Sequence, residues 1–256
     1  MIIEIIQPCE ELKGYIEHFW VGRWEGCGKE HFTYYATANI QTELVFAYTI
    51  HPVYGPELVF SSVQGHTDSF GQYPVSGVNE LFGVSLYAHA IPYLFDISAS
   101  ELNNQLVYFD ALLEGQPDRG VNEKMAMATT VQQRVAVLTD YFKLQLRDKY
   151  TKDPVMSGAI QYIKQHKGMV NIRELASEFC LSQKQFERRF KSFTSFTPKL
   201  YSRVTRFDAA FMACLSNGSL AEVAYTHGYY DQAHFIHEFK KFSGFSPQKY
   251  FSLADY

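Results

Sequence analysis

The feature that most constrains this chain is a pattern of two short helices between Ser219 and Tyr250. Apolar residues three and four apart predict the first helix, and Gly228 then indicates a turn that needs positive φ. Asp231 is a favourable N-cap for a second helix, which has phenylalanines on one face and polar residues on the other. Ser246 followed by proline predicts the start of one more helix. Two short helices joined by a glycine turn are typical of a helix-turn-helix.

The same pattern occurs upstream, between Asn171 and Tyr201. Positions before the turn repeat at an offset of 48 and positions after it at 49, which indicates one inserted residue near Tyr230. The pairs at the second offset are Phe186 with Phe235, Phe190 with Phe239, Lys191 with Lys240, Phe193 with Phe242, Phe196 with Phe245 and Pro198 with Pro247. A register kept over six pairs rarely arises by chance, so the sequence contains an internal repeat.

This tandem resembles the DNA-binding domain of AraC/XylS-type bacterial transcription regulators. The resemblance covers roughly residues 153–253 and implies a transcription regulator that binds double-stranded DNA. The matching positions of the second copy are Ala224, Gly228, Tyr229, Asp231, Gln232, Phe235, Phe239, Lys240, Lys241, Gly244, Ser246, Pro247 and Tyr250. Two positions depart from the family pattern. Cys180 stands where a turn glycine is usual, and His237 stands where an arginine is usual, which predicts a weaker base contact by the second copy.

The charge distribution agrees with a DNA-binding C-terminal half. The whole chain of 256 residues has a net charge of −4, which by itself argues against a nucleic-acid partner. Residues 151–256, however, contain 14 Lys and Arg against 9 Asp and Glu, whereas residues 1–150 contain 9 against 18. A basic module joined to an acidic one therefore accounts for the total, and the basic module contains the repeat.

The first predicted recognition helix has a charged face opposite its phenylalanines. Its charged residues recur at i, i+3, i+4 and i+7, and Arg and Glu can read guanine and cytosine edges directly. We therefore predict that Lys184, Glu187 and Arg188 face the bases, and that Ser182 and Lys191 contact phosphates. The alternative is an ordinary solvated face, as on any exposed helix.

The second recognition helix has a less charged outer face. Glutamine can pair with adenine, while alanine offers only apolar contact, for instance with a thymine methyl group. The predicted base-facing residues are Gln232, Ala233, His234 and His237, and the predicted phosphate contacts are Lys240 and Lys241. The two histidines could equally be ordinary exposed side chains that contact only water.

The N-terminal half is predicted to be rich in β-strands. Residues 31–50, 56–64 and 80–95 are rich in β-branched and aromatic residues, and clusters of turn residues at 51–56, 65–71 and 74–79 separate them. This pattern favours an antiparallel barrel or sandwich. Two helices are also expected: one over Glu10–Trp20, and one over Ser98–Leu113 that begins with a capping box.

Helices are expected to connect the two halves. Thr130 and Gln133 predict the cap of a helix whose apolar stripe is Val131, Val135, Leu138, Phe142 and Leu146. The stripe is either a dimer face or the contact of this helix with its own domain. Tyr150–Pro154 is the expected linker, and a rigid helix over Pro198–Leu215 is expected to join the two copies of the repeat.

The sequence therefore predicts an α+β chain. Residues 1–150 are expected to form a β-rich, barrel-like or sandwich sensing domain with a helical connector, and residues 151–256 an all-α tandem helix-turn-helix domain. The expected partners are double-stranded DNA, a small-molecule effector at unidentified residues, RNA polymerase and a second copy of the chain. No catalytic residue, metal site or cofactor is predicted, since the four cysteines are far apart and the N-terminal histidines form no ligand pair. The absence of a signal peptide or long apolar run predicts a cytoplasmic protein without a membrane segment. A DNA-targeted enzyme, and a regulator whose N-terminal domain only dimerises, are the alternatives.

Overall fold

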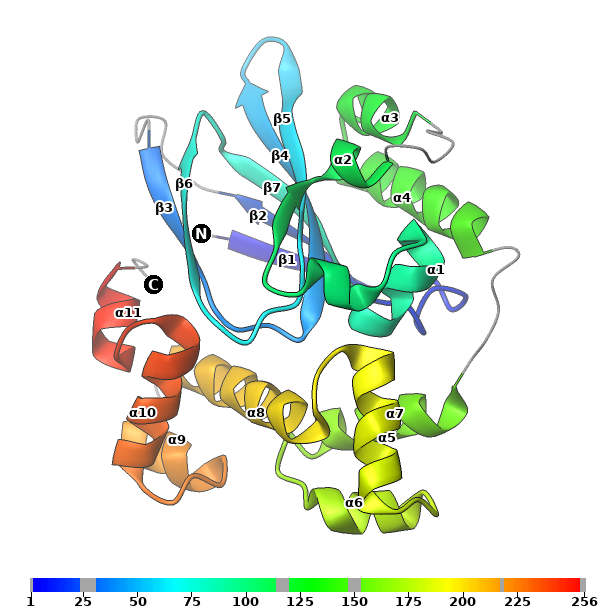
Figure 1. Cartoon of the computed structure of the whole chain (residues 1–256). Helices are drawn as coiled ribbons and strands as arrows, with labels where there is room; N and C mark the ends of the chain where they lie inside the picture. Colours follow the sequence, from blue (N-terminus) through cyan, green and yellow to red (C-terminus); the bar gives the residue numbers. More distant parts are fainter. Residues whose placement is uncertain (1, 24–30, 114–119, 147–152, 217–218, 254–256) are drawn as a thin grey trace. The chain divides into compact units, whose positions relative to one another are not determined.

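The chain consists of two compact units. The computed structural model describes residues 2–23, 31–113, 120–146, 153–216 and 219–253 (Figure 1). The first unit comprises Met1–Tyr34, Gln41–His66 and Pro74–Tyr150, and the second comprises Tyr35–Ile40, Thr67–Tyr73 and Thr151–Tyr256. Two short segments of the N-terminal half thus group with the second unit. The domain boundary near residue 150 remains a prediction, because much of the expected linker lies outside the described residues.

The first unit is built on a six-stranded antiparallel sheet. The strand order is β1-β2-β7-β4-β5-β8, which leaves the sheet open at β1 and β8 among the described residues. The strands are β1 (Ile2–Ile6), β2 (Ile16–Arg23), β4 (Gln41–His51), β5 (Gly55–Gln64), β7 (Glu80–Tyr87) and β8 (Leu106–Tyr108). A separate two-stranded sheet pairs β3 (His31–Ala36) with β6 (Gly71–Ser76). The prediction of a β-rich N-terminal half followed by a helical one is confirmed, with an open sheet in place of a closed barrel.

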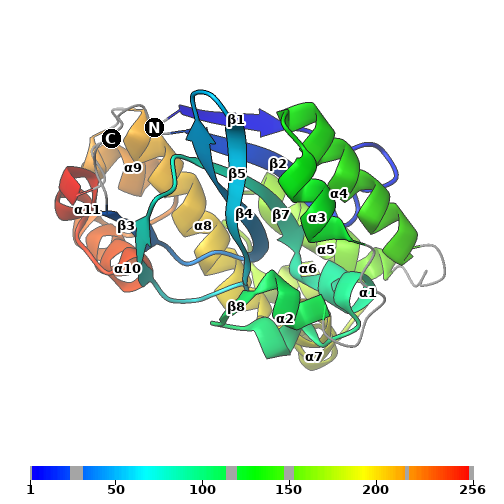
Figure 2. The ribbon, with the colours of Figure 1, turned by 90° about the horizontal axis from the view of Figure 1, so that it is seen from above.

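Helices cover one face of the large sheet (Figure 2). They are α1 (Ile91–Phe95), α2 (Phe109–Leu113), α3 (Val121–Met127) and α4 (Val131–Leu146). Alternation along the strands points Phe19, Phe46 and Phe82 toward these helices, and all three side chains are fully buried. Burial of aromatic rings between the sheet and the helices is the main source of stability for such a layer.

The apolar stripe of α4 belongs to this core. Leu138 and Phe142 are fully buried within it, and Val131, Val135 and Leu146 pack against it. The stripe therefore contributes to the interior of its own unit, as the second interpretation expects, and a dimer contact through its partly buried residues stays a prediction. The predicted cap is confirmed: the Gln133 side chain accepts from the backbone N–H of Thr130, whose hydroxyl accepts from the N–H of Gln133.

The helix expected over Glu10–Trp20 is absent. The N–H groups of Tyr15 and Ile16 both donate to the carbonyl of Leu12 at 2.8 Å, which closes a single turn before β2 begins. A register shift between Ile16 and His18 then bends the strand. Spacings of three and four residues arise equally from one turn followed by a bulged strand, so the periodicity was not specific to a helix.

Three further local predictions are wrong. Residues 80–95 are extended only as far as Tyr87; a 3₁₀ turn, η1 (Ala88–Ala90), and α1 follow, with Pro92 in the first helical turn. The capping box of Ser98 does form, but it caps only a 3₁₀ helix, η2 (Ala99–Leu102). Asn104 then takes a positive φ of 57°, and β8 and α2 replace the rest of the expected helix. Residues 71 and 74–76, which were predicted to belong to turns, lie in β6.

The second unit contains seven helices among its described residues. They are α5 (Pro154–Gln165), α6 (Ile172–Glu178), α7 (Gln183–Thr194), α8 (Pro198–Leu215), α9 (Leu220–Thr226), α10 (Gln232–Ser243) and α11 (Pro247–Leu253). The predicted connecting helix over Pro198–Leu215 is confirmed as α8, which lies between the pair α6–α7 and the pair α9–α10 (Figure 1). Across the described residues, none of the helices combines the length and apolar character needed to cross a bilayer.

Candidate nucleic-acid interface

The two copies of the repeat share one backbone plan. In each, a polar N-cap begins the first helix, Asn171 for α6 and Ser219 for α9, and a left-handed residue ends it. The connection from α9 to α10 contains one residue more than that from α6 to α7, which accounts for the change of offset. Two copies with the same caps and turns therefore present their second helices in the same way.

Cys180 adopts the turn conformation of the glycine that it replaces. Its φ is 55°, against 67° for Gly228 in the second copy. The following N–H groups close the same hydrogen bond in both turns, from Leu181 to Ala176 at 3.0 Å and from Tyr229 to Ala224 at 2.9 Å. The cysteine thus preserves the geometry of the turn at the cost of a left-handed residue with a Cβ.

The ends of the second helices are also equivalent. Ser195 ends α7 with a φ of 65°, and Gly244 ends α10 with a φ of 82°. The hydroxyl of Thr194 donates to the carbonyls of Phe190 and Phe196. At the equivalent position of the second copy, the hydroxyl of Ser243 donates to the carbonyls of Phe239 and Phe245. The repeat is therefore maintained at backbone level even where the residue types differ.

Helix α7 buries its phenylalanines and exposes the predicted DNA-facing residues. Phe186 and Phe190 are fully buried, and Ser182 caps the helix in a capping box with Gln185. Glu187 accepts a hydrogen bond from the Gln183 amide at 2.8 Å, within the same exposed face. The residues predicted to face DNA from this copy are all exposed: Ser182, Lys184, Glu187, Arg188 and Lys191.

Helix α10 has the same division of faces. Its predicted base-facing and phosphate-facing residues are all exposed: Gln232, Ala233, His234, His237, Lys240 and Lys241. Asp231 caps the helix by accepting from the N–H of His234 at 2.7 Å. The His234 ring also accepts from the N–H of Tyr230 at 3.4 Å, so this imidazole partly serves the turn. Their exposure allows DNA contact by these residues, and that contact remains a prediction.

Comparison with known proteins gives a different family match for each half of the chain. A family model described as a helix-turn-helix domain matches residues 175–252, and one described as a domain of unknown function (DUF6597) matches residues 4–108. No curated protein sequence matches the chain. The matched helix-turn-helix region contains the whole second copy of the repeat and the first copy from Leu175 onward, so both turns lie within it.

The chain is an AraC/XylS-type DNA-binding regulator. Solved structures that match the chain include ToxT from Vibrio cholerae O395, at 11% identity over 92% of this chain and 97% of that chain, with a TM-score of 0.49. The C-terminal domain of AraT, a response regulator from Geobacillus stearothermophilus, matches at 26% identity over 38% of this chain and 84% of that chain, with a TM-score of 0.36. The structure of the xylose-binding transcription activator xylR matches at 19% identity over 47% of this chain and 39% of that chain, with a TM-score of 0.36.

An ion pair braces each recognition helix of this AraC/XylS-type chain at one equivalent position. Arg189 of α7 makes a two-pronged contact with Asp153, the N-cap of α5, at 2.7 and 2.8 Å. The equivalent residue of α10 is Glu238, at an offset of 49. Glu238 accepts from Arg203 of α8 at 3.0 Å and from Arg206 of α8 at 3.3 Å. The helix that precedes each pair thus holds its recognition helix through a charge.

The two ion pairs differ in their burial. The Glu238 side chain is only 5% exposed, whereas the side chain of Arg189 is 43% exposed. Burial alone would raise the pKa of Glu238, but the hydrogen bond and charge of Arg203, with the charge of Arg206, hold that pKa below its ordinary value. Glu238 therefore stays ionised in the interior, where an uncompensated carboxylate would be costly.

Sequence reasoning missed both ion pairs, although one had a signal. Glu238 lies three residues after Phe235 and four before Phe242, so it falls on the buried stripe of α10. An acidic residue at a core position needs a cationic partner, and Arg203 and Arg206 lie one turn apart on the preceding helix. Arg189 has the same spacing from the phenylalanines of α7, but a long cationic side chain can extend from such a position to the surface, so the spacing alone did not predict its partner.

The described residues contain no group of three or more His, Cys, Asp and Glu side chains that could hold a metal ion. Individual N-terminal histidines instead make local contacts. The His51 ring accepts from the backbone N–H of Val53 at 3.1 Å, and the His89 ring bonds the carbonyl of Gly14 at 2.8 Å. Among the described cysteines, Cys9, Cys180 and Cys214 are free thiols.

Proposed function

We propose that this chain is a sequence-specific regulator of transcription whose α7 and α10 enter successive major grooves of one DNA duplex. The observation that supports this most is the paired division of faces: each recognition helix buries phenylalanines and exposes polar groups suited to base edges. Because α8 is a continuous helix between the two pairs, it holds them at a fixed separation. Reading heads on one face of B-DNA would meet grooves about 34 Å apart.

The two helices are proposed to contribute unequally. Lys184, Glu187 and Arg188 give α7 charged groups that can bond base edges, and Arg188 can pair with guanine through two hydrogen bonds. Helix α10 offers Gln232, Ala233, His234 and His237. We propose that α7 supplies most of the sequence discrimination, and that Ser182, Lys191, Lys240 and Lys241 position the protein on phosphates.

The first unit is proposed to bind a small-molecule effector. It contains a cavity of about 580 Å³, within the usual size range of ligand sites. A ligand that binds one state of this unit better than another would shift its population and thereby alter DNA binding. Because a DNA-binding regulator must reach the chromosome, we propose that the protein acts in the bacterial cytoplasm.

Selection of duplexes from a random pool tests this function. The full chain should enrich a two-part motif whose halves lie about one helical turn, roughly 10 base pairs, apart. The logarithm of its binding constant should fall linearly with the logarithm of salt concentration. The double variant Lys184→Ala/Arg188→Ala should lose one half of the motif, whereas Lys124→Ala in the first unit should enrich the same motif. Equal enrichment by the double variant would exclude α7 as the main reading helix.

A further inference from the structure

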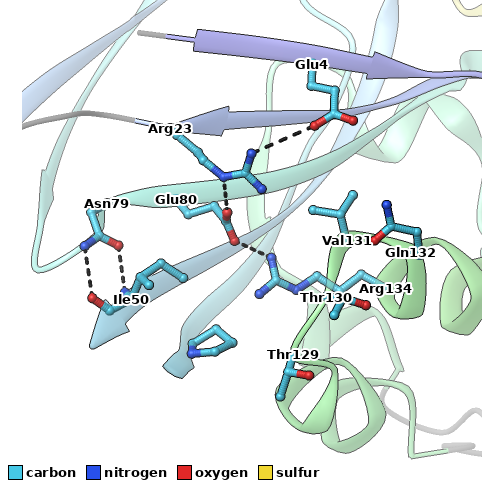
Figure 3. Close-up of a pocket in the computed structure, with 11 residues that line it drawn as sticks. Glu4, Arg23, Ile50, Asn79, Glu80, Thr129, Thr130, Val131, Gln132 and Arg134 are labelled. Atoms are coloured by element: carbon cyan, nitrogen blue, oxygen red, sulfur yellow. Dashed lines mark hydrogen bonds and ion pairs between the residues drawn. The ribbon is translucent and has the colours of Figure 1, made fainter. Parts of the chain in front are cut away.

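A charged cavity lies between the end of the large sheet and the start of α4, within the first unit. It has a volume of about 580 Å³ and is lined from β1, β2, β7, the β4–β5 hairpin and the residues that begin α4. Figure 3 shows a row of four charged side chains along one wall. In order, they are Glu4, Arg23, Glu80 and Arg134.

The inner end of this row is fixed. The Arg134 side chain is 2% exposed and donates to one oxygen of Glu80, whose side chain is 6% exposed. The Arg134 guanidinium also lies 3.6 Å from the centre of the Tyr48 ring, and its Nε donates to the carbonyl of Ala128 at 3.3 Å. Burial raises the pKa of Tyr48 to about 12, so its hydroxyl remains a neutral donor to the carbonyl of Met125. These contacts hold the Glu80 carboxylate rigidly as part of the wall.

The outer end of the row is held loosely. Arg23 donates to the second oxygen of Glu80 at 2.6 Å, but its nearest approach to Glu4 is 3.9 Å. A separation of 3.9 Å between nitrogen and oxygen exceeds that of a hydrogen bond. The side chains of Arg23 and Glu4 are 45% and 52% exposed, and Glu4 belongs to β1, an edge strand. Glu4 thus places a carboxylate beside Arg23 without a close bond, and a carboxylate from a ligand could make the closer contact.

The opposite wall favours the same charge on a ligand. Val131 and Gln132 line the cavity and form the first turn of α4, a helix of 16 residues. Their N–H groups have no earlier helical carbonyl to bond, and the start of a helix carries partial positive charge. The cavity also has an apolar part, formed by Ile50, Pro56 and the Val131 side chain. An anionic group with an apolar body fits both walls.

We propose that this cavity binds a small organic carboxylate, whose carboxylate bonds Arg23 in place of Glu4 and faces the start of α4. Its apolar body lies against Ile50, Pro56 and Val131. Binding of a carboxylate in this cavity does not depend on the proposed function. Only the role of that carboxylate as the effector of a regulator rests on it. Inorganic phosphate would satisfy the charged wall and leave the apolar part unused.

The test is direct binding to the full chain by ligand-observed NMR, with benzoate, benzylamine, benzyl alcohol and inorganic phosphate as probes. Benzoate should bind with saturation, and the other three should bind at least about tenfold more weakly, because each lacks either the charge or the apolar body. Binding of benzylamine or benzyl alcohol as tightly as benzoate would overturn the assignment of charge. Phosphate that bound as tightly as benzoate would overturn the assignment of an apolar organic body to the ligand.

Two variants should move benzoate affinity in opposite directions. Arg23→Gln removes the guanidinium while Arg134 still bonds Glu80, and it should weaken benzoate about tenfold or more. Glu4→Gln removes the competing carboxylate from an exposed position, and it should strengthen benzoate about threefold. The matched controls Lys124→Gln and Glu123→Gln make the same charge changes at exposed positions of α3 and should leave the affinity unchanged. An unchanged affinity in Arg23→Gln, or a weaker one in Glu4→Gln, would overturn the site.

A parallel measurement of DNA binding separates this proposal from the proposed function. Loss of DNA selectivity with benzoate binding as predicted would exclude the proposed function and support the cavity site. Normal DNA selection by a chain that binds no carboxylate would overturn the cavity site and support the proposed function.

Discussion

The two helix-turn-helix copies share a backbone and differ in where they place charge. At one equivalent position, α7 has Arg189 paired with Asp153 near the surface, and α10 has Glu238 paired with two arginines in the interior. The exposed faces of the two helices differ in the opposite sense: α7 is densely charged there, whereas α10 is mostly neutral. The comparison shows that the repeat preserves caps, turns and a brace between helices, while the sign and burial of the charges vary.

Removal of the buried brace should give the largest effect. Glu238→Ala leaves Arg203 and Arg206 without their partner in a site that is only partly open to water, and we expect a loss of about 3 kcal/mol in the stability of the second copy. Hydrogen exchange of the α10 amides measures this loss as faster local opening. The control Glu187→Ala, on the exposed face of α7, should leave exchange in α10 unchanged. Unaltered α10 protection in Glu238→Ala would show that the phenylalanines alone hold the helix.

The same carboxylate should make the second copy sensitive to acid. Because the pKa of Glu238 is lower in the folded chain than its ordinary 4.5, the unfolded chain takes up the proton first as pH falls. The stabilisation by the pair is therefore complete above about pH 4.5 and is lost as pH falls through the lowered pKa. Urea unfolding at several pH values should show a shallower acid loss for Glu238→Gln than for the unmodified chain. Parallel pH profiles would assign the acid sensitivity to other groups.

Substitutions on the exposed faces of α7 and α10 should lower DNA affinity by different amounts. Arg188→Ala should cost about 1–3 kcal/mol of binding and relax specificity at one or two base pairs, because a two-bond contact to guanine is lost. His237→Ala should cost less, since the second copy has an imidazole where an arginine is usual. Base-by-base scanning of the selected site with both variants measures the two contributions. A larger loss in His237→Ala would reverse the assignment of the dominant helix.

The left-handed residues of the two turns can be tested by opposite substitutions, one that removes a Cβ and one that adds it. Cys180→Gly removes a Cβ from a left-handed residue and should stabilise the first copy by about 0.5–1 kcal/mol, after the greater freedom of glycine in the unfolded chain is counted. Gly228→Ala should destabilise the second copy by about 1–2 kcal/mol, because the new Cβ would also lie 3.1 Å from the Met169 sulfur. Thermal unfolding of both variants checks the signs. Destabilisation by Cys180→Gly would mean that the cysteine side chain contributes packing that outweighs its strain.

The second unit was predictable from sequence because its signals are local. Caps such as Asp231, turns such as Gly228 and a phenylalanine stripe each lie within a few residues of the structure they specify. The first unit depends on distant partners. Arg134 and Glu80, 54 positions apart, bond in the interior, and the α4 stripe does not reveal whether its contact is internal or with a second copy. Spacing alone likewise did not separate a single turn at Leu12 from a helix.

The smallest effect is expected at the surface brace of the first copy. Arg189→Ala removes the partner of Asp153, but water can solvate this partly exposed carboxylate, so we expect a loss of only about 0.5 kcal/mol. Asp153→Ala should cost more, about 1 kcal/mol in addition, because Asp153 also caps α5 by accepting from the N–H of Met156 at 3.0 Å. Hydrogen exchange of the α7 and α5 amides separates the two roles, since only the second variant should loosen the start of α5. If Arg189→Ala loosened α7 as much as Glu238→Ala loosened α10, burial would not be the property that distinguishes the two braces.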